Sequence, residues 1–346
     1  MEISKLRSEE IPLFTPLEAR HNHFSGLPSE SLTLSPEARE LLRSGNGSSQ
    51  CPDVSPCPLP SITPEAGALP PDADKFQEMM EQTRTLEGYN RYFRGVDSLS
   101  PVKVKVVEKI PTVKSQVFLT FDDGPFGSGD GYEATTPELL RILKDKKAQA
   151  TFFFQGYWAW KHPEISKEVV SQGSNIGNHT YHHPPDGYFQ GPIPGQKKKF
   201  GDLEPGEQAQ ELLWGRAGIL WGSRKNAGIL PLFRSPHGSA VLAPSHDPKT
   251  LERIAKNGHV IINGNLRLSD AKPDITAEKL ISTYRDYFRT VPPGARKGEI
   301  LWLHSGLKAT REALPVIIDE LKALGYEVAA LPPCLGAREN AQDAAA

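Results

Sequence analysis

Two adjacent carboxylates, Asp122 and Asp123, come directly after the apolar run of residues 117–121. Neighbouring carboxylates at the end of a strand repel each other unless a cation neutralises them. With a metal ion present, one of the two could bind the ion while the other accepts a proton. The simpler interpretation is an Asp-Gly-Pro turn that carries two acids by chance. On this motif alone, both interpretations stay open.

A pair of histidines, His179 and His183, lies four residues apart in the run HTYHHP. On a helical turn such residues share one face, so both imidazoles could bind one ion. His182 would point elsewhere and is not expected to be a ligand. Two histidines and one carboxylate, with open positions for water, form a metal site of a known catalytic type. Zinc is the ion we expect first, although cobalt, nickel or iron also accept this ligand set.

Two further motifs also end apolar runs. Arg234 opens the run RSPHG and could hold a buried carboxylate in its ionised form. The turn that follows, which contains His237, could present backbone N–H groups to an oxyanion. His304 ends the run LWLH and could act as a general acid. Taken singly, each motif has a plain structural alternative: a turn with a surface arginine, and a capped core histidine.

Apolar runs and helical patterns alternate along most of the chain, which favours a parallel α/β sheet. Val102, Val104 and Val106 alternate with lysines and predict a half-exposed strand. The strand-like runs cover residues 117–121, 150–154, 175–178, 230–234, 260–263, 300–303 and 328–331. The helical patterns cover residues 137–146, 163–171, 207–220, 248–257, 277–289 and 311–324. Seven such strands could curl into a barrel, whose functional residues would lie at the carboxyl ends of the strands.

The first part of the chain has a different composition, rich in Pro, Ser, Glu and Gly. We expect residues 1–100 to be an extension that is largely coil, with short helices over 35–44 and 74–83. We expect a catalytic domain over residues 101–340. The sequence contains no internal repeat.

Composition excludes several classes of protein. The net charge of −2 argues against a basic nucleic-acid binder, and no apolar run is long enough to span a membrane. The first residues lack the apolar core of a signal peptide. We nevertheless expect a periplasmic or secreted protein whose leader is not present in this chain, because the substrate inferred below lies outside the cytoplasm. Cys51 and Cys57 could form a small disulfide loop or stay as two thiols.

The four motifs TFDDGP, HTYHHP, RSPHG and LWLHSG, in this order and spacing, resemble the signatures of the NodB-homology polysaccharide deacetylases, carbohydrate esterase family 4. The resemblance covers about residues 116–331. It implies an irregular (β/α)7 barrel. It also implies that Asp122 is the general base, and that Asp123, His179 and His183 bind one divalent metal ion.

The resemblance implies three supporting roles as well. Arg234 would orient the base, His304 would be the general acid, and the backbone N–H of His237 would help to hold the oxyanion. The family usually has an aromatic residue where this chain has His237, but a backbone group does the work. The family also has an Asp-rich motif ending in Trp that supports the catalytic histidine.

That supporting motif is altered in this chain. Asn263 and Asn265 stand about where an Asp is expected, and no Trp follows them. Asp270 comes a few residues late, beyond the expected end of the strand. Asp270 is a possible substitute for the missing Asp, but its late position favours a surface residue, which is what we expect. His304 would then lack its anionic partner, and its pKa would be lower than in relatives that keep the Asp.

The sequence therefore predicts a metal-dependent hydrolase that removes N-acetyl groups from N-acetylglucosamine units of a cell-wall glycan, with peptidoglycan as first choice. Chitin oligosaccharides and other acetylated sugars are alternative substrates. A non-catalytic glycan-binding protein on the same scaffold is an alternative of a different class. We expect a monomer. Trp158 and Trp160 could stack on sugar rings, although packing in the core is the simpler role for them.

Overall fold

A computed structural model describes residues 73–184, 198–223, 228–239, 249–272, 274–290, 292 and 295–336 of the chain. The helix predicted over residues 35–44 lies outside these described residues. Cys51 and Cys57 lie outside them as well.

All strands of the described chain belong to one parallel sheet, in the order β1-β6-β5-β4-β3-β2-β8-β7, with β9 also paired to β2. The strands are β1 (Val106–Val107), β2 (Gln116–Asp122), β3 (Thr151–Phe154), β4 (Asn175–Asn178), β5 (Ile229–Phe233), β6 (Val260–Ile262), β7 (Leu266–Arg267), β8 (Ile300–His304) and β9 (Glu327–Ala329). The seven strands predicted from apolar runs are all present.

The sheet closes through one irregular segment. β6 pairs with β5, and β7, which follows after residues 263–265, pairs with β8 on the other side. The segment 260–267 therefore links the side of the sheet that contains β6 and β5 to the side that contains β8, which gives the irregular α/β barrel that the sequence predicted. The half-exposed strand expected from Val102 onward is wrong in extent. Only Val106–Val107 pairs regularly, because the residues before it make isolated bonds such as that of Val102 N–H to Ala255 O.

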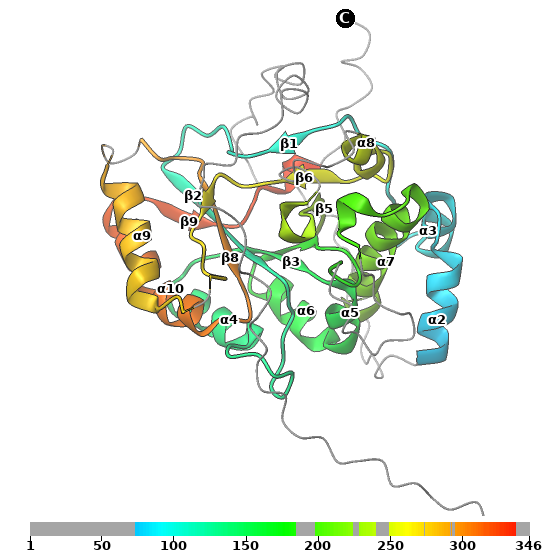
Figure 1. The fold of residues 1–346 in the computed structure, drawn as a ribbon, viewed down its shortest axis with the longest axis horizontal. Helices are drawn as coiled ribbons and strands as arrows, with labels where there is room; N and C mark the ends of the chain where they lie inside the picture. The colour runs from blue at the N-terminus through cyan, green and yellow to red at the C-terminus, as the bar shows by residue number, and fades with distance from the viewer. Residues whose placement is uncertain are drawn as a thin grey trace, which may run out of the picture.

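Helices follow most of the strands and cover the outside of the barrel. They are α2 (Ala73–Gln82), α3 (Leu86–Tyr92), α4 (Thr136–Asp145), α5 (Gly156–Lys161), α6 (Pro163–Ser171), α7 (Pro205–Ser223), α8 (Lys249–Lys256), α9 (Ala277–Arg289) and α10 (Lys308–Ala323). Figure 1 shows α2 and α3 beside α7, and α9 and α10 on the opposite side of the barrel. The sequence missed α3 and α5, which are the shortest helices. Among the described residues, no helix combines the length and apolar character needed to cross a membrane.

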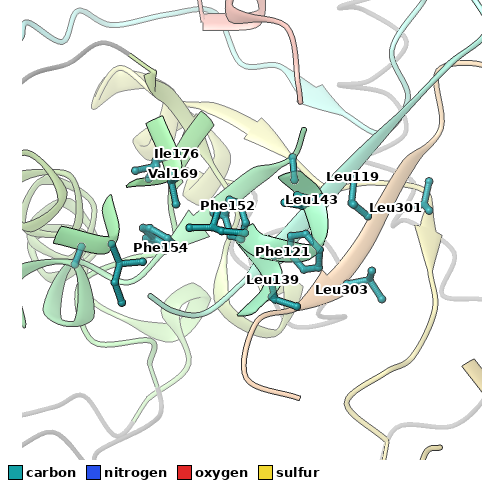
Figure 2. Close-up of a cluster of buried hydrophobic side chains, with 14 of the residues drawn as sticks. Leu119, Phe121, Leu139, Leu143, Phe152, Phe154, Val169, Ile176, Leu301 and Leu303 are labelled. Carbon is teal, nitrogen blue, oxygen red and sulfur yellow. The ribbon is translucent and has the colours of Figure 1, made fainter. Parts of the chain in front are cut away.

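The alternation of side chains along β2 separates two apolar layers. Leu119 and Phe121 pack outward, in the cluster between the strands and helices α4 and α6 that Figure 2 shows. Phe118 packs in a second cluster inside the barrel. Because successive strand residues face opposite sides, Thr120 and Asp122 share the inward face with Phe118. This places the carboxylate of Asp122 in the mouth of the barrel.

The described end of the N-terminal segment is docked on the barrel through apolar and ionic contacts. Phe76 and Tyr89 are fully buried in the outer cluster. Asp97, which follows α3, accepts hydrogen bonds from Arg216 Nε at 2.6 Å and from Tyr89 Oη at 2.6 Å. Arg216 lies on α7, so a buried ion pair fixes this segment to the longest helix.

Candidate active site

The predicted site residues lie at the carboxyl ends of neighbouring strands. Asp122 ends β2 directly beside His304, which ends β8. His179 follows β4, and Arg234 follows β5, the strand that pairs with β4. Since all these strands are parallel, their carboxyl ends meet at one edge of the barrel.

Asp123, His179 and His183 come together as a cluster whose ligand atoms all lie within 4.8 Å of one another. Asp123 Oδ1 is 3.2 Å from His183 Nε2 and 3.6 Å from His179 Nε2. Successive residues of a strand point to opposite faces, but Asp123 has a left-handed φ of 67°. This turn lets Asp123 face the same pocket as Asp122.

The donor atoms of this cluster suit a cation. His179 Nδ1 donates to the carbonyl oxygen of Arg234 at 2.7 Å, so Nε2 is the ring nitrogen that faces Asp123. Burial raises the pKa of the Asp123 carboxyl, but the imidazoles of His183 and His179 outweigh burial and hold that pKa well below its usual range. Asp123 Oδ1 is buried and accepts no hydrogen bond.

The two histidines do not share a helical turn, as their spacing had suggested. Residues 179–184 form no helix, and Thr180 and His183 have left-handed φ values of 71° and 58°. Glu211 of α7 binds this loop through hydrogen bonds. Its Oε2 accepts from the backbone N–H groups of Tyr181 and His182 at 3.0 Å each, and its Oε1 lies 2.6 Å from His182 Nδ1. His182 therefore faces α7.

Arg234 holds Asp122 at the mouth of the barrel. Its Nη1 donates to Asp122 Oδ1 at 2.7 Å and to Thr120 Oγ1 at 2.9 Å. The guanidinium lies 4.3 Å from the ring centre of Phe153 and 4.5 Å from that of Trp302. Burial lowers the pKa of Arg234, and the charge of Asp122 opposes that effect. Asp122 Oδ2 is buried and accepts no hydrogen bond, so one oxygen of the carboxylate is anchored and the other is available.

Asp270 is the anionic partner of His304, and the expectation that it is a surface residue is wrong. Asp270 is buried, and its Oδ1 lies 2.8 Å from His304 Nδ1. Its Oδ2 accepts from the backbone N–H of His304 at 2.7 Å and from Thr310 Oγ1 at 2.6 Å. The chain does leave the strand after β7, but a left-handed turn at Ser269, with φ 57°, accompanies the return of Asp270 to β8.

The electrostatic consequence for His304 is also opposite to the expected one. Burial lowers the pKa of its imidazole, but the charge and hydrogen bond of Asp270, helped by Asp123, raise it to about 10. The two asparagines at the expected position serve other roles. Asn265 Oδ1 accepts from the backbone N–H of Ile300 at 3.0 Å, and Asn263 Nδ2 donates to Glu108 at 3.2 Å.

His237 lies in a short turn (Pro236–Gly238) after β5 with a left-handed φ of 56°. Its ring centre is 4.8 Å from that of His183, so the turn borders the cluster of Asp123, His179 and His183. The aromatic residues after β3 have a structural role instead. Trp158 is buried, and Trp160 packs against the outer apolar cluster.

Sequence reasoning missed two residues of this site, Glu211 and Arg267. A signal for Glu211 existed, because it precedes the largely apolar stretch 212–221 of a predicted helix, where a buried charge needs a partner. Arg267 places a second guanidinium 4.2 Å from the ring centre of Trp302. Burial and the charge of Arg234 lower the pKa of Arg267 to about 10.

Residues 109–241 match the family model described as "Polysaccharide deacetylase". Residues 109–241 therefore form a polysaccharide deacetylase domain. The matched segment contains the cluster of Asp123, His179 and His183 together with Asp122, Arg234 and His237, whereas His304 and Asp270 follow it.

Two relatives match this chain over most of their own length. The chitooligosaccharide deacetylase of Azorhizobium caulinodans is 27% identical over 239 residues, which are 65% of this chain and 96% of that protein. The peptidoglycan-N-acetylglucosamine deacetylase of Bacillus cereus is 27% identical over 228 residues, or 64% of this chain and 88% of that protein.

Solved structures share the fold of this polysaccharide deacetylase domain. The Bc1960 peptidoglycan N-acetylglucosamine deacetylase has a TM-score of 0.51 at 24% identity, and the match covers 66% of this chain and 91% of that one. A carbohydrate esterase family 4 pseudoenzyme from Bacillus anthracis has a TM-score of 0.51 at 23% identity, with 68% and 70% covered.

Proposed function

We propose that this protein is a metal-dependent hydrolase that removes N-acetyl groups from N-acetylglucosamine units of a cell-wall glycan. The observation that carries the proposal is the position of a two-histidine, one-carboxylate cluster between a carboxylate and an imidazole. Asp122 Oδ2 lies 3.8 Å from His179 Nε2, and His304 is the neighbour of Asp122 across β2 and β8. A base, an acid and a cation site therefore face one space.

Asp123, His179 and His183 are the residues that would hold the ion. They fit a divalent cation because Asp123 Oδ1 is buried without a hydrogen bond and two imidazole Nε2 atoms face it. Zinc suits this set, and its positive charge would polarise an amide carbonyl and make a neighbouring water more acidic.

Asp122 acts as the general base in this proposal. Arg234 anchors its Oδ1, so Oδ2 is the atom that takes the proton of the attacking water. The water oxygen forms a bond to the acetyl carbonyl carbon. The backbone N–H of His237 donates to the oxygen that becomes negative.

His304 acts as the general acid. Asp270 holds its Nδ1, so Nε2 is the nitrogen that delivers a proton to the departing amine. The carbon–nitrogen bond breaks, and the products are acetate and a free glucosamine unit. The Asp270 pair also removes the feature of the sequence that had favoured a non-catalytic glycan-binding protein.

Peptidoglycan is the substrate we propose first, and chitin oligosaccharides come second. The two relatives above carry these two activities in their names, at equal identity to this chain. A peptidoglycan substrate would place the protein in the periplasm or outside the cell, and we propose that location and a monomeric state.

An acetate-release assay over peptidoglycan, chitin hexasaccharide and acetylxylan tests the proposal. We expect acetate from peptidoglycan, and none above background with Asp122→Asn. The matched control is Asp145→Asn, an exposed carboxylate at the end of α4, which should behave as wild type. Binding of the glycans without acetate release would instead identify a non-catalytic glycan-binding protein.

A further inference from the structure

The loop between β2 and α4 carries a pair of stacked aromatic rings, Phe126 and Tyr132. Their ring centres are 3.5 Å apart and the rings are inclined by 17°. Trp158 meets both rings edge-on, at 5.5 Å from Phe126 and 5.8 Å from Tyr132. Phe126 is buried, whereas Tyr132 is 43% exposed. A buried ring and a tryptophan therefore support one exposed ring.

The loop that presents Tyr132 is fixed by hydrogen bonds within the loop and to residues of α4 and α5. The buried carboxylate of Asp130 accepts from Gly127 N–H at 2.7 Å and from Lys161 Nζ at 2.6 Å. Thr136 Oγ1 accepts from Phe126 N–H at 2.9 Å, and Thr136 N–H donates to Phe126 O at 2.9 Å. A ring held in this way loses little freedom when a ligand covers it.

Tyr132 packs against the turn that follows the general acid. Gly306, two residues after His304, has so little room that an added Cβ would lie 2.7 Å from Tyr132 Cδ1 and 2.9 Å from Phe126 Cε2. Ala134 N–H donates to Gly306 O at 3.2 Å. The exposed ring thus borders the end of β8, where the proton for the leaving amine would come from.

Tyr132 stands out among the large apolar side chains that the structure describes. Four of them are exposed: Tyr92, Val113, Tyr132 and Leu324. Of these, Tyr132 is the one that contacts the end of a catalytic strand. A tyrosine offers an apolar face and a polar hydroxyl, and the pyranose ring of a sugar likewise has an apolar C–H face bordered by hydroxyl groups.

We infer that Tyr132 is the stacking surface of a binding subsite for a second sugar ring of the glycan, next to the unit that is deacetylated. This inference rests on the proposed function. It predicts that the chain prefers oligosaccharides, because a longer glycan reaches both the catalytic residues and Tyr132. Trp158, which the sequence had suggested for this role, acts beneath the surface by supporting Tyr132.

The test uses chitin disaccharide and hexasaccharide as probes of the full chain. Tyr132→Ala should raise KM for the hexasaccharide by about threefold to tenfold, the loss expected for one aromatic contact. The rise in KM should be smaller for the disaccharide. Tyr132→Phe, which keeps the ring, should have a KM for the hexasaccharide close to that of wild type. The matched control is Tyr92→Ala, a tyrosine of similar exposure at the end of α3, which should leave KM at the wild-type value.

Calorimetry compares the affinity of wild type and of Tyr132→Ala for the hexasaccharide, and this measurement does not depend on catalysis. Weaker binding by the variant, with an unchanged melting temperature, supports the subsite even if no acetate is released and the proposed function fails. Equal affinity of both proteins, or equal KM changes for the two oligosaccharides, overturns the subsite while leaving the deacetylase proposal intact. If Tyr132→Ala melts early, Tyr132→Leu, which keeps apolar volume without a ring, decides by the same criterion.

Discussion

Asp270 contacts His304 at two places, the ring Nδ1 at 2.8 Å and the backbone N–H at 2.7 Å. One buried carboxylate therefore fixes the end of β8 and the orientation of the ring that it carries. Thr310, in the first turn of α10, donates to the same carboxylate at 2.6 Å. Asp270 therefore joins three segments of the chain at His304.

Asp270→Asn should lower kcat by roughly tenfold or more, because the amide cannot stabilise the imidazolium. Asp270 raises the pKa of His304 to about 10, so its removal should move the alkaline limb of the kcat profile to lower pH. The pair of Asp270 and His304 also stabilises the folded protein. This contribution is complete below about pH 6.5 and is lost as the pH rises through the pKa of His304 in the folded state. Asp274→Asn, an exposed neighbour, is the control. An unchanged alkaline limb in Asp270→Asn would contradict this role.

The metal-binding cluster should hold one divalent ion per chain. If the ion is zinc, ligand distances of about 2.0–2.2 Å are expected. His179→Ala and His183→Ala should each lose the ion, as measured by elemental analysis, and a chelator should lower the melting temperature of wild type only. His162→Gln, which removes an imidazole at the end of α5, should keep the ion. Full metal content in both alanine variants would exclude this site.

Neutralising Asp122 and neutralising Asp123 should have different effects on metal binding and turnover. Asp122→Asn should keep the metal and lower turnover by roughly a hundredfold or more, because an amide cannot accept the proton of water. Asp123→Asn should bind the metal more weakly, since the variant loses an anionic ligand. Metal titration and acetate release on the same samples separate the two. Identical behaviour of the two variants would mean that the roles are assigned wrongly.

Glu211→Gln should weaken metal binding without a direct contact to the ion. The amide no longer offers the charged acceptor that holds the loop between His179 and His183, and outer partners of this kind change affinity by about 10–100-fold. Competition with a chelator measures the affinity. Glu204→Gln, exposed just before α7, is the matched control. The idea fails if Glu211→Gln and the control bind the metal equally well.

Asp97→Asn should destabilise the whole domain, because it leaves the buried guanidinium of Arg216 without its anion. A loss of about 3–5 kcal/mol in the free energy of unfolding is typical of such a change. Tyr89→Phe removes a neutral donor to the same carboxylate and should cost about 1 kcal/mol. Urea unfolding measures both. Equal stability losses would show that the ion pair does not fix this segment.

Most of the fold was predictable because most strands contain a short apolar run and most of the long helices have an amphipathic pattern. The helices α3 and α5 were missed since they span too few residues to show a period. The segment that closes the barrel was not predictable, because residues 260–267 change their strand partner midway. Nothing in the side-chain pattern marks that change.

The site residues were predictable where chemistry follows directly after a strand, as at Asp122. Their partners were harder to predict because left-handed turns set them. Asp270 returns to the site after a left-handed Ser269, and the loop of His183 also bends at left-handed residues. Such turns are carried by non-glycine residues, which give no signal in the sequence.

The position of β2 in the sheet has a consequence for how the protein is made. β2 pairs with β8 through Phe118 and Ile300, and with β9 through Gln116 and Glu327. A chain growing from its N-terminus therefore produces β2 long before two of its three partners exist. Until then β2 has an unpaired edge, which is a site for wrong pairing with other chains. A nascent chain would already contain Asp123, His179 and His183, but it would gain His304 only after β8 has been synthesised.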